Sequence, residues 1–343
     1  MIDVHAHAWP RGLLEAVATG RAWWGYEPVD LADGRRVLAL GDRLIRFPPP
    51  PTDLVDLPSR RGRRHAGAGV RAELVQPVGF LWGEHLHGAD LEAYLGEIND
   101  ELAAAQRSDP DWFVGVGLLP LHDPSVTLQA LHRILDSGLE VVSIPTNARG
   151  RNLDDATVLP LVEEVLARDV AVIVHPTYLS PAGAERFPRY YFANSFGAPL
   201  ESALALLSLV HAGLLDRHDG TRLLLVNGAG CTPYEIGRFD RRWDERPDVR
   251  TMADPPSRYL SQVFYDSLVL DEETLRLLVG RVGSERVALG TDFPFRTDRP
   301  EGPDAWIAAM DWLDEDARAD LRWRTAERFL GRHVGTSAAS GRS

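Results

Sequence analysis

The feature that most limits how this chain can fold is a regular alternation of short apolar runs with amphipathic segments. Eight runs are apolar and rich in β-branched residues, which is typical of strands buried in a parallel sheet. The predicted strands are Ile2–His5, Glu73–Pro77, Phe113–Leu119, Glu140–Pro145, Val170–His175, Arg222–Asn227, Gln262–Asp266 and Arg286–Thr291. The predicted helices include Leu91–Ser108, Ser125–Ser137, Thr157–Arg168, Pro199–Leu215 and Glu272–Val279. This α/β alternation predicts a (β/α)8 barrel, or TIM barrel. A doubly wound open sheet is the alternative, but no strand is followed by its Gly-x-Gly-x-x-Gly turn.

Two segments depart from the alternation. Residues 20–50 contain short β-prone runs around Asp33-Gly34, so we expect a small β-hairpin inserted after the first strand. Four prolines at positions 48–51 then lead the chain back toward the barrel. Residues 1–332 are therefore predicted to form one domain, and the small polar residues 333–343 a disordered tail. The basic cluster Arg60–Arg64 is interpreted as a solvent-exposed helix face.

Four metal-ligating side chains stand at the ends of predicted strands. His5 and His7 are spaced i, i+2, so on a strand both point to the same face. His175 and Asp292 each end an apolar run that a proline closes shortly afterwards. Taken singly, His175 also fits a half-buried histidine and Asp292 a helix N-cap. Active sites of such barrels lie at the C-terminal ends of the strands, where all four fall. We therefore predict that these four residues bind one divalent metal ion.

Charge and cysteine content limit the setting of the protein. Lysine and arginine number 37 against 50 acidic residues, a formal charge of −13, which argues against nucleic-acid and membrane-headgroup partners. Cys231 is the only cysteine, so an internal disulfide is excluded and a reducing compartment is favoured. We find no apolar run approaching the roughly 20 residues that span a bilayer and no basic-then-apolar leader. We expect a cytoplasmic protein.

Several further motifs share a pattern with a known family. They are Ile2–His7 with Pro10, Phe113–Pro120, Val174–Pro176, Pro233–Arg238, Ser257–Leu260, Tyr265–Val269, Leu289–Phe295 and Ala326–Gly331. Together with the four strand-end residues, they make the chain resemble the amidohydrolase superfamily. The closest resemblance is to its amidohydrolase-2 branch, typified by 2-amino-3-carboxymuconate-6-semialdehyde decarboxylase. The resemblance covers nearly the whole chain and includes the insertion at 20–50.

The resemblance implies roles for individual residues. It makes His5, His7, His175 and Asp292 the ligands of a metal ion, most often Zn²⁺, with Mn²⁺ or Co²⁺ as the alternatives. It implies that arginines hold substrate carboxylates, a task that suits the planar guanidinium fork.

Three arginines of this chain match those positions. They are Arg46 at the end of the hairpin, Arg238 in a Gly-Arg pair, and Arg246 as a weaker candidate. The family counterpart of Arg238 enters the neighbouring subunit's pocket, so we expect a homodimer. Tyr191 and Phe295 are expected to contact the substrate, a small carboxylic acid.

One departure from the family affects the chemistry. The family ends its sixth strand with histidine, whereas this chain has Asn227-Gly228-Ala229-Gly230. An asparagine can hydrogen-bond but cannot exchange a proton near neutral pH. We therefore expect Asn227 to lie beside the metal-bound water and to alter the proton chemistry.

Three functions remain open. The first is a metal-dependent decarboxylase of a small unsaturated or aromatic carboxylic acid, in which His85 or His87 would supply the proton that Asn227 cannot. The second is a hydrolase of an amide, ester, lactone or carbon–carbon bond, with Asp292 taking a proton from metal-bound water. The third is a non-hydrolytic rearrangement or cyclisation enzyme, or a non-catalytic metal-binding relative.

Overall fold

The structure is a computed structural model of the chain, and it describes residues 1–45, 60, 64, 68–187, 189–295 and 302–334. Eight parallel strands form one sheet in the order β1-β5-β6-β7-β10-β11-β12-β13. They are β1 (Ile2–Ala8), β5 (Ala72–Pro77), β6 (Phe113–Leu118), β7 (Val141–Pro145), β10 (Ala171–His175), β11 (Leu223–Leu225), β12 (Phe264–Asp266) and β13 (Val287–Ala288). The segment after β13 returns to β1: the Val4 amide donates to the Leu289 carbonyl and the Asp292 amide to the His5 carbonyl, both at 2.8 Å. The predicted (β/α)8 barrel is confirmed.

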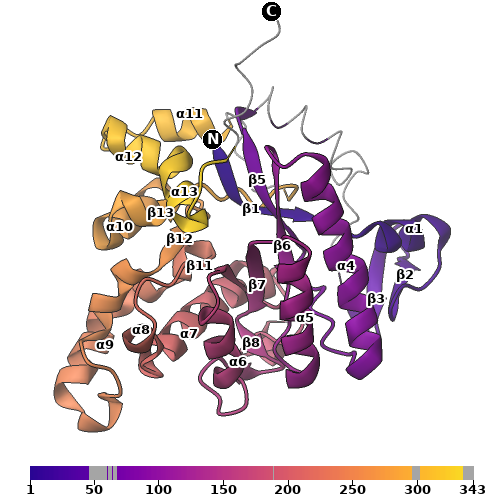
Figure 1. The fold of residues 1–343 in the computed structure, drawn as a ribbon, viewed down its shortest axis with the longest axis horizontal. Coiled ribbons are helices and arrows are strands. Elements are labelled where there is room, and N and C mark those ends of the chain that lie inside the picture. Colours follow the sequence, from indigo (N-terminus) through magenta and orange to yellow (C-terminus); the bar gives the residue numbers. More distant parts are fainter. Residues whose placement is uncertain (46–59, 61–63, 65–67, 188, 296–301, 335–343) are drawn as a thin grey trace, which may run out of the picture.

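Helices surround the sheet (Figure 1). The described helices are α1 (Arg11–Thr19), α4 (Gly88–Ser108), α5 (Pro124–Asp136), α6 (Leu159–Leu166), α7 (Ala198–His211), α8 (Leu214–Arg217), α9 (Thr232–Glu245), α10 (Glu272–Val282), α11 (Pro303–Ala308), α12 (Glu315–Ala319) and α13 (Thr325–Leu330). The predicted helix Pro199–Leu215 divides into α7 and α8 at Gly213, whose φ of 64° an α-helix cannot contain. The helices α1, α9 and α11 to α13 were not among those predicted.

The insertion after β1 forms a separate sheet. Strands β2 (Tyr26–Asp30), β3 (Arg36–Leu40) and β4 (Arg43–Ile45) pair antiparallel, which confirms the predicted β-hairpin insertion. This sheet stands at the edge of the barrel beside α4 (Figure 1). The loop before β2 is held against α4, because the indole N–H groups of Trp23 and Trp24 donate to the two carboxylate oxygens of Glu97 at 2.9 and 2.8 Å. A minor pair, β8 (Asn147–Ala148) and β9 (Arg151–Asn152), follows β7.

The C-terminal helix closes one end of the barrel. Phe329 and Leu330 of α13 pack with the apolar side chains that alternate along the inner face, such as Val4 and Ile173. Val334, 3% exposed, belongs to the same cluster. The predicted disorder of residues 333–343 stays a prediction, because residues 335–343 lie outside the described part. Because α13 covers the N-terminal ends of the barrel strands, the C-terminal ends of these strands are available for a functional site.

Two sequence interpretations need correction. Arg60 and Arg64 are 0% and 3% exposed and do not form a solvent-exposed face, because the buried carboxylates of Asp3 and Glu73 neutralise them. In addition, Ala193–His211 is long and apolar enough to cross a membrane by length and composition, so the expectation of no such run was too strong. Some 56% of its apolar window is buried inside the fold, as for a helix of a protein core.

Candidate metal centre and adjoining groove

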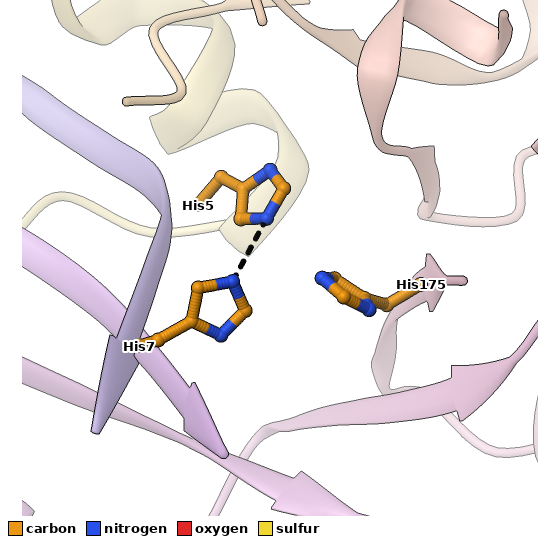
Figure 2. A group of neighbouring side chains, drawn as sticks. All are labelled: His5, His7 and His175. Atoms are coloured by element: carbon orange, nitrogen blue, oxygen red, sulfur yellow. Dashed lines mark hydrogen bonds between the residues drawn. The ribbon is translucent and has the colours of Figure 1, made fainter. Parts of the chain in front are cut away.

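Three histidines meet at the C-terminal end of the barrel. His5 and His7 come from β1 and His175 from the end of β10, and their ring centroids lie 5.1 Å apart in every pairing. All three side chains are 2% exposed. Figure 2 shows the rings facing a common point, with the Nε2 atoms of His5 and His7 3.1 Å apart. Two nitrogens bound to one zinc ion at about 2.1 Å in tetrahedral geometry lie about 3.4 Å apart, so the observed spacing suits a shared cation.

The other ring nitrogen of each histidine is held by an oxygen. His5 Nδ1 lies 2.6 Å from Asp266 Oδ2, His7 Nδ1 lies 3.2 Å from the Pro77 carbonyl, and His175 Nδ1 lies 2.9 Å from the Pro176 carbonyl. Each Nδ1 must carry a proton to donate to its oxygen, which leaves the Nε2 lone pair free for a metal. These contacts set both the tautomer and the direction of each ring.

Asp292 completes the predicted set of four ligands. Its Oδ1 lies 2.9 Å from His7 Nε2 and 3.6 Å from His5 Nε2. The residue stands in the left-handed region, with φ 58°, a conformation that costs free energy for a non-glycine residue and needs support from its surroundings. Three imidazole nitrogens and one carboxylate oxygen are a donor set that divalent zinc and related metals accept. The chemistry of these side chains therefore fits a divalent metal ion.

Burial and charge set the protonation of the histidines. Burial lowers the pKa of His7 and lowers that of His175 well below its ordinary value. Burial also opposes the charged form of His5, but the hydrogen bond and charge of Asp266 outweigh it and raise the pKa of His5. Neutral rings at His7 and His175 are ready to bind a cation.

Two residues of the site escaped the sequence analysis. Asp266 is fully buried at the end of β12 and holds His5; as the last residue of an apolar strand, it carried the same signal as Asp292. Gln76 pairs with His7 in the β1–β5 register, so the two side chains share one face of the sheet. It is 1% exposed, and its Nε2 has no hydrogen-bond partner among the residues that the structure describes. Apart from its place near the end of a predicted strand, nothing in the sequence indicated that Gln76 belongs to the site.

A groove of about 860 Å³ adjoins the metal centre. Aromatic side chains dominate its walls, and its lining includes Phe80, Tyr178, Phe187, Tyr190, Tyr191 and Asn194. The ring of Tyr178 lies 6.5 Å from that of His175, and burial together with the Asp292 charge raises the pKa of Tyr191 to about 12. The contact between Tyr178 and His175 places this wall of the groove beside the three histidines.

Two arginines also line this groove. Arg43 comes from β4 of the insertion and Arg189 from the segment that precedes α7. Neither guanidinium forms an ion pair with any described residue. Both are therefore available to an anionic ligand in the groove.

Comparison with known proteins decides the family. The sequence profile of the family described as Amidohydrolase matches residues 2–332. The chain belongs to the amidohydrolase family. The 2-amino-3-carboxymuconate-6-semialdehyde decarboxylase of Dictyostelium discoideum is 34% identical over 262 residues, which cover 74% of this chain and 70% of that protein. The resemblance predicted from the motifs is thus confirmed, and the chain is an enzyme of this family.

Solved structures share the fold at lower identity. The 5-carboxyvanillate decarboxylase of Sphingomonas paucimobilis superposes with a TM-score of 0.80 at 18% identity, covering 97% of this chain and 99% of that one. The dihydroxybenzoic acid decarboxylase of Polaromonas sp. JS666, solved with manganese and the inhibitor 2-nitroresorcinol, gives a TM-score of 0.75 at 19% identity and covers 98% and 99%. Both agree with the barrel described above.

The remaining predicted site residues fall in different places. Phe295 lies at the metal centre, 5.5 Å from the His7 ring, and Tyr191 lines the groove. Arg46 lies outside the described residues. Arg238 and Arg246 are exposed at α9 and just after it, where they pair with Glu235 and Asp248 within the same chain. The homodimer that would bring Arg238 to a neighbouring subunit's groove stays a prediction.

The described contacts of Asn227 and His87 are with residues other than the three histidines. The Asn227 amide donates to Ser202 Oγ of α7 at 3.4 Å. His87 is half exposed before α4, and its Nε2 lies 3.1 Å from a guanidinium nitrogen of Arg149. Among described residues, no contact joins either side chain to the metal centre.

Proposed function

We propose that this amidohydrolase is a metal-dependent decarboxylase of a small aromatic or unsaturated carboxylic acid. The observation that carries the proposal is the juxtaposition of three convergent histidines with an aromatic groove that holds two guanidiniums with no ion pair to any described residue. The similarity to the Dictyostelium decarboxylase, at 34% identity over most of both chains, supports this reaction over others of the family.

The groove suits a planar acid. Tyr178 and Tyr191 line the groove with aromatic rings on which a conjugated substrate can stack, and Arg43 and Arg189 supply guanidinium groups for its carboxylates. A substrate bound here would lie between the guanidiniums and the metal ligands.

The metal centre supplies the electrophile. We propose one divalent ion held by His5, His7, His175 and Asp292, with zinc and manganese as the two candidates. When bound, such a cation acts as a Lewis acid toward an oxygen of the substrate or of water. The Nδ1 contacts of the three histidines keep the ligand nitrogens in place throughout.

Decarboxylation needs a proton at carbon, and the side chains differ in their ability to provide it. An asparagine amide at position 227 is not an acid near neutral pH. His87 lies at the exposed start of α4. We assign proton handling to Asp292, whose carboxylate contacts His7 and would pass a proton taken from water to the carbon that loses carbon dioxide.

A product assay tests the proposal. Metal-loaded protein is incubated with carboxylated aromatics and muconate-like acids in ¹⁸O-labelled water, and released carbon dioxide and labelled products are measured. We expect carbon dioxide without ¹⁸O in the organic product, and loss of activity together with metal in His175→Ala. Incorporation of ¹⁸O at a cleaved bond would assign the chain to the hydrolases instead.

A further inference from the structure

Four buried charges form a cluster behind the metal centre. Arg60 and Arg64 meet the carboxylates of Asp3 and Glu73, and all four side chains are between 0% and 3% exposed. Arg60 Nε donates to Glu73 Oε2 at 2.8 Å and Arg64 Nε to Glu73 Oε1 at 2.6 Å, so one carboxylate joins both guanidiniums. We call these four residues the charge clamp. Its two positive and two negative charges balance, which is how buried charges persist in a protein interior.

The clamp grips the backbone that carries the metal ligands. Asp3 Oδ1 accepts the amide N–H of His5 at 3.0 Å and that of Thr291, the neighbour of Asp292, at 3.1 Å. A guanidinium nitrogen of Arg60 donates to the carbonyl of His7. Three of the four ligands are therefore held through their own peptide groups or through an adjacent one.

The clamp also surrounds the residue after Asp292. The guanidinium carbons of Arg60 and Arg64 lie 4.5 and 4.3 Å from the ring centroid of Phe293, within the range of cation–π contact. Arg64 Nη2 further donates to Thr291 Oγ1 at 3.0 Å. Asp292 needs such support, because its φ of 58° is unfavourable for a residue with a side chain.

We propose that the charge clamp positions β1 and the 291–293 segment for metal binding, so that it sets the metal affinity as well as the stability of the barrel. The inference rests on the metal centre and not on the reaction catalysed there. Neither the metal ligands nor the groove residues belong to the clamp, so its members act as positioning residues. Hydrogen-bonded support around metal ligands commonly changes metal affinity by about 10–100-fold when removed.

The test separates positioning from stability. Arg64→Met alone leaves buried carboxylates without their partner and is expected to destabilise the fold strongly. The double variant Arg60→Met/Glu73→Gln restores charge balance, keeps the Arg64–Asp3 ion pair and removes the contact of Arg60 with the His7 carbonyl, and it should recover most of the thermal stability. We expect its affinity for Zn²⁺ and Mn²⁺ to stay at least tenfold below that of the wild type. The measurement is a competitive chelator titration of the metal-stripped full chain.

A second variant and a control complete the design. Arg64→Lys keeps the charge but cannot reach Glu73, Asp3 and Thr291 at once, so it should fold and still lose metal affinity. The control Arg222→Met/Asp169→Asn removes an ion pair of 2.7 Å at the opposite end of the strands, and should leave metal affinity unchanged. Wild-type affinity in folded Arg64→Lys or in the double variant would overturn the proposal. Because the readout is metal binding, a failed decarboxylase assay would not affect this outcome.

Discussion

Asp266→Asn removes the negative charge behind His5 while keeping the shape of the side chain. In the native protein Asp266 Oδ2 lies 2.6 Å from His5 Nδ1, and Oδ1 accepts the amides of Gly228 and Leu268 at 3.0 and 3.3 Å. Two backbone donors favour an oxygen on their side, so the new NH₂ group should face His5. The NH₂ group and the Nδ1–H group of His5, both donors, would then face each other. The alternative is that the proton of His5 moves to Nε2, which removes the lone pair that a metal needs.

The size of the effect follows from the burial of this contact. Leaving a buried donor unsatisfied costs about 1–3 kcal/mol, and loss of a carboxylate behind a metal-bound histidine typically costs about 10–100-fold in metal affinity. At about 1.4 kcal/mol for each factor of ten, the two figures agree. We therefore expect the dissociation constant for Zn²⁺ or Mn²⁺ to rise by about 10–100-fold, as measured by competition with a chromophoric chelator.

The control variant is Asp314→Asn. Asp314 caps α12 by accepting the Ala317 amide at 2.8 Å, and that helix carries no residue of the metal centre. It should bind metal like the wild type. If Asp266→Asn also bound metal normally while folded, the assignment of the His5 tautomer to Asp266 would be wrong.

Three further outcomes are expected. Arg43→Gln and Arg189→Gln should each raise KM for an acidic substrate several-fold at unchanged metal content, since each removes an exposed cation from the groove; an unaltered KM would exclude the residue from substrate binding. Burial raises the pKa of Glu84 above its ordinary 4.5, so the stability associated with this group is fully present below pH 4.5 and is lost as pH rises through the raised pKa. Glu84→Gln should accordingly gain unfolding free energy relative to the wild type between pH 4 and 8 in urea titrations, and a constant difference would contradict the shift. Light scattering should show a dimer at micromolar concentration, and a monomer would remove the role proposed for Arg238.

Much of the fold follows from the sequence because buried parallel strands are continuous apolar runs. The strands β6 and β10 lie within one residue of their predicted bounds. The predicted strand Arg286–Thr291 is shorter in the structure, where it spans Val287–Ala288. The Leu289 amide instead donates to the Leu321 carbonyl near the C-terminus, and the Asp292 amide donates to the His5 carbonyl of β1. Where a strand ends depends on its backbone hydrogen bonds to neighbouring segments, and a single sequence does not show which segments are neighbours.

The cluster of three histidines was also predictable, whereas the charges around it were not. His5 and His7 lie in the C-terminal part of β1, His175 ends β10 and Asp292 follows β13, and a barrel brings the C-terminal parts of its strands together. Arg60 and Arg64 looked like a surface cluster, because their neutralising carboxylates lie elsewhere in the sequence and become neighbours only in the fold. Arg43 and Arg189 were missed for the same reason: a groove formed by an insertion and a distant loop has no sequence signature.

The backbone conformation at position 227 gives a second reason, besides the chemistry of the side chain, for an asparagine there. The turn Asn227-Gly228-Ala229-Gly230 has φ values of 57°, 56°, 56° and 59°, and asparagine is among the few residues with a side chain that tolerate this region. Its amide is directed to Ser202 of α7, while the next amide, of Gly228, donates to Asp266. The backbone of this turn is thus linked to His5 through Asp266, which bonds to both. Position 227 is therefore linked to the metal centre through the backbone of this turn, and the altered proton chemistry expected from its side chain stays a prediction.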